Sequence, residues 1–183
     1  PRETEQLPVR VETLDAHGSS AGETRVPTPG TVTVIDLFAT WCAPCDDQLD
    51  ILNAMQPQYT DVSFVSVTNE RPSETLTRAD ISEWWNRNGG AWPVGLDPGS
   101  ELLAALGAEG LPYIAIADES GTVQFGHSGL AGKETLRDEL DELARENERL
   151  REELAAERAE RTDLERQLTD RESEGLARYL PWR

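Results

Sequence analysis

The two cysteines of the chain stand together where an apolar run gives way to a helical pattern, in the segment IDLFATWCAPCDDQ (35–48). The run TVTVIDLFA (31–39) is mostly β-branched and apolar, which predicts a strand buried on both faces. A helix is predicted to begin near Cys42. It should end at about Met55, because Pro57 cannot continue it. The cysteine pair is therefore expected at a strand-to-helix junction.

Three kinds of site fit two cysteines separated by two residues. A structural zinc site needs about four ligands. The two histidines, His17 and His127, lie far away in polar segments, so we expect no metal. A structural staple is disfavoured because closing so short a loop restricts the unfolded chain little. A redox pair is favoured.

The start of a helix changes the chemistry of the first thiol. Unpaired amide groups and the helix macrodipole stabilise the thiolate of Cys42, whose sulfur we expect to be open to solvent. Cys45 lies one turn further along, within reach to attack a mixed disulfide on Cys42 and release the product. This arrangement predicts dithiol/disulfide exchange without a cofactor.

The other elements predict an α/β fold with a mixed central sheet and helices on both faces. Strands are expected over 9–14, as an edge strand, and 61–68, helices over 77–90 and 100–110, and a hairpin over 112–129. Trp84 and Trp85 are adjacent in the first of these helices. We therefore expect one of them in the core and the other at the surface.

From Lys133 onward the chain consists of strong helix formers, without proline or glycine as far as residue 174. Many leucines are spaced by three and four residues, which predicts a coiled-coil seam. They are Leu136, Leu140, Leu143, Leu150, Leu154, Leu164 and Leu168. With Leu136 at heptad position d, Asn147 falls at position a, where asparagine sets the register of a parallel two-stranded coil. The helix is expected to form a parallel homodimer.

The same register predicts attraction between two chains, from Glu146 to Arg151 and from Glu153 to Arg158. Charged residues on the seam weaken the coil beyond Leu154, and these are Glu157, Arg161 and Arg171. In one alternative, the first turns cover the sheet through Leu136, Leu140 and Leu143, and only the stretch from about Arg145 is free to pair. In others, the helix stays alone, docks within its own chain or is disordered.

Three parts are expected along the chain: an N-terminal extension with an edge strand (1–30), an α/β domain (31–145) and a helical coiled-coil extension (146–183). The final residues, GLARYLPWR (175–183), are candidates to anchor the end of the helix through their apolar side chains.

The formal net charge of −18 argues against binding to nucleic acids or to anionic membrane surfaces. Lys133 is the single lysine. An acidic chain with so little lysine is typical of halophilic proteins, whose surface charges are screened by molar salt. The alternative is an acidic protein of a mesophile. No apolar run approaches the roughly twenty residues of a membrane-spanning helix. The sequence begins at Pro1 rather than a methionine, so we expect that a preceding segment was removed.

The segment FATWCAPC (38–45) resembles the active site of the thioredoxin superfamily and is most similar to that of TlpA/ResA-type thiol–disulfide oxidoreductases. GLPYIAIADESGTVQFGHSG (110–129) resembles the family's cis-proline segment and edge hairpin, and WPVGLDPGSELLAALG (92–107) resembles its insert. The resemblance covers about residues 8–145. It implies a thioredoxin-like fold, protein dithiol or disulfide substrates and an upstream electron donor. It also implies an extracytoplasmic or membrane-anchored location, with a cytoplasmic one as the alternative.

The resemblance also implies roles for individual residues. Cys42 is the attacking nucleophile, Cys45 is the resolving thiol, and Pro112 is the proline in cis. Three further positions are implied to contact the substrate or tune the site: Trp41, a partly exposed aromatic residue; Pro44, which tunes the redox potential; and Leu111, whose backbone hydrogen-bonds an extended substrate segment.

The acidic residues expected near the cysteines depart from the TlpA/ResA pattern at two positions. Gln48 stands where that type usually has a glutamate, and it cannot take up a proton. Asp36 stands six residues before Cys42, where thioredoxin itself has a buried aspartate. Because a buried charge is costly, we expect a raised pKa for Asp36 and a role as proton acceptor for Cys45. The alternative is that Asp36 points to solvent at a strand end.

Asp46 and Asp47 occupy the first turns of the helix, where thioredoxins often have a basic residue. Negative charge near Cys42 opposes thiolate formation. We therefore expect a higher pKa for Cys42 than a basic version of this site would have.

The sequence thus predicts a disulfide oxidoreductase that reduces, or less readily oxidises, protein disulfides. A peroxiredoxin-like peroxidase is an alternative, but that class needs a threonine or serine where Ala39 stands, and Thr40 comes one position too late. A second alternative is a non-enzymatic assembly module that acts through its coiled coil.

Overall fold

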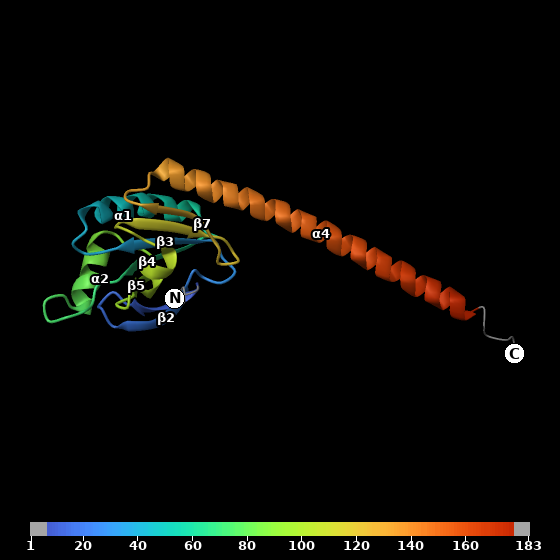
Figure 1. The fold of residues 1–183 in the computed structure, drawn as a ribbon, viewed down its shortest axis with the longest axis horizontal. Helices are drawn as coiled ribbons and strands as arrows, with labels where there is room; N and C mark the ends of the chain where they lie inside the picture. Colours follow the sequence, from blue (N-terminus) through green and yellow to red (C-terminus); the bar gives the residue numbers. More distant parts are fainter. Residues whose placement is uncertain (1–6, 178–183) are drawn as a thin grey trace. The chain divides into compact units, whose positions relative to one another are not determined.

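A computed structural model describes residues 7–177, with side chains as far as Arg171. The chain divides into two compact units, Pro1–Leu140 and Asp141–Arg183. The first unit contains a seven-stranded sheet in the order β2-β1-β5-β4-β3-β6-β7 (Figure 1). Its strands are β1 (Val9–Leu14), β2 (Ser20–Val26), β3 (Thr33–Phe38), β4 (Ser63–Thr68), β5 (Val94–Leu96), β6 (Tyr113–Ala117) and β7 (Val123–Ser128).

Helices follow β3, β4, β5 and β7 along the chain. They are α1 (Ala43–Met55), the short 3-10 helix η1 (Gln56–Gln58), α2 (Arg78–Arg87), α3 (Glu101–Leu106) and α4 (Lys133–Ala177). Strands β3, β4 and β5 run parallel, whereas β1, β6 and β7 each pair antiparallel with their neighbours. The predicted α/β fold with a mixed central sheet is confirmed.

The segment 9–14 forms a strand, but the prediction that it lies at the edge of the sheet is wrong. β1 lies between β2 and β5, and β2 takes the edge position. Five of the seven residues of β2 are exposed, as edge strands allow. Its sequence, SAGETRV, therefore lacks the apolar alternation by which strands are found.

Alternating side chains of β3 divide the core between the two faces of the sheet. Ile35 and Leu37 belong to one cluster with Leu102 of α3. Phe38 points to the other face, where its ring stacks on Trp84 of α2 with the centroids 4.8 Å apart. Asp36 lies on the same face as Phe38, because side chains two positions apart in a strand point the same way.

The expectation that only one of Trp84 and Trp85 is buried is wrong, because their exposed fractions are 6% and 4%. The chain beyond α2 folds back over the second ring. Trp85 donates its indole N–H to the carbonyl of Trp92 (3.2 Å), and the two rings pack edge-on. A Cβ on Gly90 would lie only 2.0 Å from the ring of Trp85, so glycine permits this close approach.

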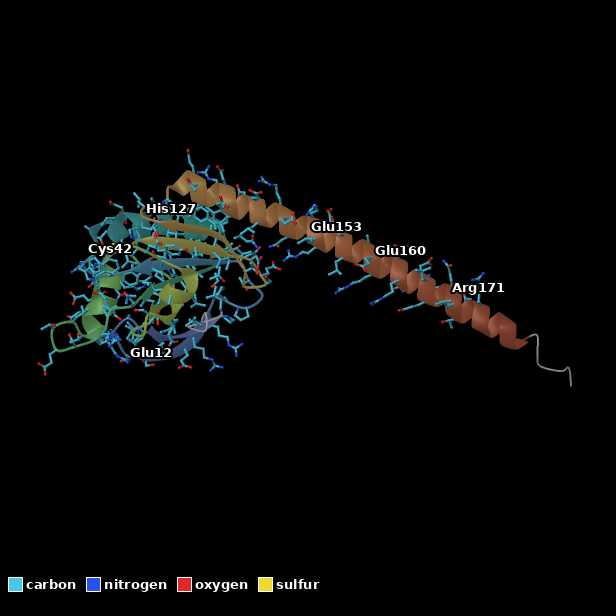
Figure 2. The ribbon with its side chains drawn as sticks, in the orientation of Figure 1. Glu12, Cys42, His127, Glu153, Glu160 and Arg171 are labelled. Atoms are coloured by element: carbon cyan, nitrogen blue, oxygen red, sulfur yellow. A yellow bond between two sulfur atoms is a disulfide. The ribbon has the colours of Figure 1, made fainter. Side chains whose placement is uncertain are left out.

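Helix α4 is continuous over 45 residues and confirms the predicted long C-terminal helix. Leu136 and Leu140 in its first turns are buried. Further along, charged side chains such as Glu153, Glu160 and Arg171 follow one another (Figure 2). The leucines of this part are about half exposed or more: Leu150 (48%), Leu154 (45%), Leu164 (52%) and Leu168 (61%).

The anchoring expected of side chains 175–183 lies outside the described residues. Among the helices of residues 7–177, none combines the length and apolarity that crossing a membrane requires.

Candidate active site

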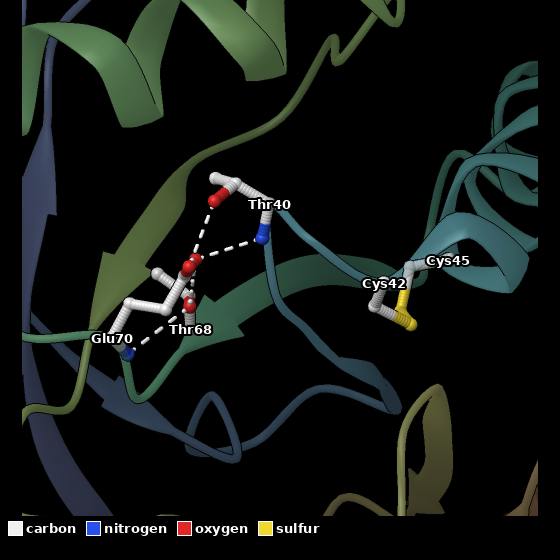
Figure 3. Close-up of a disulfide and its surroundings, with 5 residues drawn as sticks. All are labelled: Thr40, Cys42, Cys45, Thr68 and Glu70. Carbon is white, nitrogen blue, oxygen red and sulfur yellow. Dashed lines mark hydrogen bonds between the residues drawn. A yellow bond between two sulfur atoms is a disulfide. The ribbon is translucent and has the colours of Figure 1, made fainter. Parts of the chain in front are cut away.

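The two cysteines form a disulfide at the start of α1 (Figure 3), with an S–S distance of 2.06 Å and Cα atoms 5.4 Å apart. Cys42 is the N-cap residue of the helix, and its carbonyl accepts a hydrogen bond from the backbone N–H of Cys45 (2.9 Å). Pro44 lies in the first turn, where its missing N–H would have no helical partner in any case. The predicted strand-to-helix junction is confirmed.

Our expectation that the sulfur of Cys42 is open to solvent is wrong for this disulfide state. Cys42 exposes 4% of its surface and Cys45 exposes 1%. The two sulfurs are bonded to each other at the start of α1, and both residues are buried. The chain neighbours of Cys42 are exposed: Trp41 at 74%, and Ala43 and Pro44 as well. The accessible surface beside Cys42 thus belongs to Trp41 and to the first turn of α1.

The loop before β6 lies at the same edge of the sheet as the disulfide. Because β6 pairs antiparallel with β3, Tyr113 lies opposite Leu37 near the end of β3. The Leu111–Pro112 peptide bond is cis, as predicted. The carbonyl of Pro112 accepts a hydrogen bond from Gly129 (2.7 Å), and Leu111 is partly exposed. The fold thus brings the predicted substrate-contacting loop to the end of the strand that leads into the cysteines.

Asp36 is buried within β3, with 2% of its surface exposed. The alternative that it points to solvent is therefore excluded. Its Oδ2 accepts a hydrogen bond from the hydroxyl of Ser66 (2.7 Å), whereas Oδ1 has no hydrogen-bond partner in the described part of the chain. Burial raises the pKa of Asp36 to about 7, although the bond from Ser66 opposes this shift. The expected raised pKa is confirmed.

Gln48 is fully buried and binds the backbone just before α4. Its Oε1 accepts from the N–H of Ala131 (2.7 Å), and its Nε2 donates to the carbonyl of the same residue (3.3 Å). Both halves of the amide are used, so the side chain serves as a clamp between α1 and the start of α4. A carboxylate at this position would have no proton to donate to the carbonyl of Ala131.

A carboxylate that the sequence analysis missed holds the loop before the cysteines (Figure 3). Glu70 accepts hydrogen bonds from the backbone N–H (2.8 Å) and the hydroxyl (2.7 Å) of Thr40. It also accepts from the hydroxyl of Thr68 (3.0 Å). Part of the signal was present, because Glu70 follows the strand predicted over 61–68. The parallel pairing of that strand with the one that leads to Cys42, which brings both strand ends to the same edge, is seen only in the structure.

Metal binding has no candidate site in residues 7–171, where no group of three histidine, cysteine or acidic side chains is close enough to hold an ion.

The sheet, the cis proline and the disulfide at the start of α1 define a thioredoxin-like protein with a Cys-x-x-Cys site. Residues 5–142 match the Redoxin family, and the chain belongs to that family. It is 23% identical over 114 residues to thiol-disulfide oxidoreductase ResA of Bacillus thuringiensis, covering 62% of this chain and 64% of ResA. It thus spans less than two thirds of that relative.

Two further proteins are similar to the chain. Thioredoxin-like protein YneN of Bacillus subtilis is 26% identical over 144 residues, which cover 76% of this chain and 79% of YneN. The pneumococcal exposed lipoprotein thioredoxin Etrx1 of Streptococcus pneumoniae is 22% identical, with a TM-score of 0.60 over 74% of this chain and all of Etrx1. The structural likeness shows the thioredoxin-like fold.

Proposed function

We propose that this protein is a thiol–disulfide oxidoreductase that reduces protein disulfides through Cys42 and Cys45. The observation that carries this proposal is the disulfide between these residues at the N-terminus of α1. There the helix dipole stabilises the anion of the first sulfur when the bond is reduced. The activity named for ResA supports the same assignment.

Two exchange steps complete the reaction. The thiolate of Cys42 attacks a substrate disulfide, forms a mixed disulfide and expels one substrate sulfur as a thiolate, which takes a proton from solvent. Cys45 then attacks Cys42, so that the Cys42–Cys45 bond forms, the bond to the substrate breaks and the second substrate sulfur leaves. Two electrons pass to the substrate, and an external dithiol must reduce the Cys42–Cys45 bond before the next cycle.

Asp36 is the proton acceptor for Cys45 in the second step. A carboxyl with a pKa of about 7 can both take and return a proton near neutral pH. Gln48 cannot share this role, because its amide does not ionise and is already bound to Ala131.

The substrate lies between the exposed ring of Trp41 and the loop at Leu111 and Pro112. This loop supplies backbone groups to an extended segment of the substrate, as a sheet edge does. The peroxiredoxin alternative is disfavoured, because Ala39 has no hydroxyl and the hydroxyl of Thr40 is held by Glu70.

The C-terminal helix forms a parallel coiled coil with a second copy of the chain. Four leucines on its seam are about half exposed or more, and burying them is favourable. Glu146 and Glu153 each also pair with Arg149 of their own helix, but such exposed pairs contribute little. The pairing is therefore a means of assembly added to the redox domain.

Reduction of insulin disulfides, with a small dithiol as electron donor, tests the function. The wild type should be active and Cys42→Ser inactive, whereas Glu74→Ala, a change at an exposed position between β4 and α2, should remain active. An inactive wild type would favour the assembly alternative. The reduction potential of the Cys42–Cys45 couple then decides between reductant and oxidant.

A further inference from the structure

Asp36 is the last member of a buried chain of side-chain hydrogen bonds. Ser66 of β4 lies directly opposite Asp36 of β3 in the parallel pairing. The hydroxyl of Ser66 donates to Oδ2 of Asp36 (2.7 Å), and Nε1 of Trp92 donates to Oγ of Ser66 (3.0 Å). Ser66 is fully buried and Trp92 is 9% exposed, so solvent does not compete for these bonds.

The indole of Trp92 fixes which group donates and which accepts in each of these hydrogen bonds. The indole Nε1–H of Trp92 can only donate, so Oγ of Ser66 must accept from it. The hydroxyl hydrogen of Ser66 is then free to point to Asp36. Oδ2 of Asp36 is held as an acceptor, and Oδ1 is the buried oxygen without a partner among the described residues.

The strand residues that surround Asp36 on this face of the sheet have no ionisable side chains. The neighbouring strands present Phe64 and Thr68 of β4 and Ile114 and Ile116 of β6, which pair in register with β3 and alternate with it. The charges of α2 are exposed, and α1 carries the buried Cys45 beside the exposed Asp46, Asp47 and Asp50. Cys45 is the buried side chain on α1 that can release a proton.

We propose that Ser66 and Trp92 are positioning residues for the resolving step: they hold Oδ2 of Asp36 and leave Oδ1 to take the proton of Cys45. The proposal rests on the thiol–disulfide exchange proposed above. As Cys45 attacks Cys42, its thiol proton moves to Oδ1, the Cys42–Cys45 bond forms, and the substrate sulfur leaves with the electron pair of the broken bond. Asp36 later returns the proton to solvent or to the departing thiolate.

Loss of the donor to Oδ2 has a defined consequence. Ser66→Ala removes a hydrogen bond to the charged form of Asp36, so the carboxyl should hold its proton to a pH about one unit higher. At pH 7 the fraction of deprotonated Asp36 then falls about fivefold, and the resolving step slows by the same factor. Raising the pH should restore the rate.

Trp92→Phe keeps a buried aromatic ring but removes the N–H that orients Ser66. The hydroxyl of Ser66 is then free to turn to other acceptors but can still donate to Asp36. The titration midpoint of Asp36 should therefore rise by less than in Ser66→Ala. Trp85→Phe is the matched control, because it removes a neighbouring buried indole whose N–H reaches the carbonyl of Trp92 rather than Ser66. Trp85→Phe should leave the titration midpoint of Asp36 unchanged.

The experiment is an NMR titration of ¹³C-labelled aspartate carboxyls in the full-length oxidised protein, with Asp36→Asn to identify the Asp36 signal. We expect a wild-type midpoint near pH 7, an upward shift in Ser66→Ala and Trp92→Phe, and a wild-type midpoint in Ser66→Thr, which keeps the hydroxyl. The rate of thiol release from a preformed Cys42 mixed disulfide is measured on the same variants.

The two proposals fail in different ways. The titration needs no substrate, so midpoints that stay at the wild-type value in both Ser66→Ala and Trp92→Phe would overturn the positioning role even in an active protein. A wild type that shows the expected Asp36 titration but exchanges no disulfides would instead overturn the proposed function. The hydrogen bonds from Trp92 through Ser66 to Asp36 would then have no catalytic role.

Discussion

Glu70 holds Thr40 at two points, accepting hydrogen bonds from its backbone N–H at 2.8 Å and from its hydroxyl at 2.7 Å. The two residues are thirty positions apart in the sequence. Thr40 lies two residues before Cys42, so the carboxylate ties the loop that leads to Cys42 to the connection that follows β4. Both residues are only partly exposed, which makes their hydrogen bonds costly to lose.

Glu70→Ala should lower the free energy of unfolding of the oxidised protein by about 1–3 kcal/mol, because two donors of Thr40 and one of Thr68 lose their acceptor. Glu70→Gln keeps one accepting oxygen and should lose less. Urea unfolding measures both, with Glu74→Ala as the control at an exposed glutamate in the same connection. Equal stability of Glu70→Ala and Glu74→Ala would contradict this role.

Asp36 should make the protein less stable as the pH rises from about 4 to 7. The native carboxyl keeps its proton up to a pKa of about 7, against an ordinary value of 3.8. The native state therefore binds more protons than the unfolded state in this range, and the free energy of unfolding falls with pH by up to about 4 kcal/mol. Below pH 4 and well above pH 7 the contribution of Asp36 to the free energy of unfolding no longer changes with pH.

Asp36→Asn removes this titration. Relative to the wild type, the variant should gain stability between pH 4 and 7 and then keep a constant advantage. Urea unfolding of both proteins at several pH values measures the difference. A difference that does not change with pH would show that Asp36 has an ordinary pKa.

Much of this site could be predicted from the local sequence. An aspartate inside an apolar, β-branched run must be buried if the run is a central strand, and so Asp36 was found. The helix predicted to begin at residue 77 does so, and the structure has both reciprocal hydrogen bonds of a capping box between Thr77 and Asp80. These predictions succeed because each depends on residues close together in the chain.

What could not be predicted depends on segments that meet only in the fold. The mostly exposed β2 is a strand because it pairs with β1, and Trp85 is buried because the chain near Trp92 returns over α2. Neither of these features has a periodic signal in its own segment.

Asp46→Lys should lower the pKa of the Cys42 thiol in the reduced protein, because it replaces an exposed negative charge in the first turn of α1 by a positive one. The absorbance of the thiolate near 240 nm, followed against pH, measures this change. Asp50→Lys, which makes the same charge change further along the helix, should have a smaller effect. A Cys42 titration that is the same in all three proteins would refute the electrostatic explanation.

Leu150→Glu combined with Leu154→Glu should convert the proposed dimer into a monomer, because two seam positions then carry like charges. Ala155→Glu with Ala156→Glu adds the same charges at outer heptad positions and should leave the dimer intact. Light scattering during size exclusion in high salt measures the mass. A wild type with the mass of one chain at every concentration would contradict the coiled coil.

The most direct test of the proposed function is to trap its covalent intermediate. Reduced Cys45→Ser, mixed with a peptide that contains a disulfide, should accumulate an adduct whose mass and fragmentation place the peptide on Cys42. Reduced Cys42→Ser should form far less of the corresponding adduct on Cys45, because Cys42 caps the N-terminus of α1, where the helix dipole stabilises a thiolate, whereas Cys45 lies inside the first turn. Adducts forming equally on either cysteine, or on neither, would contradict the assignment of Cys42 as the attacking thiol.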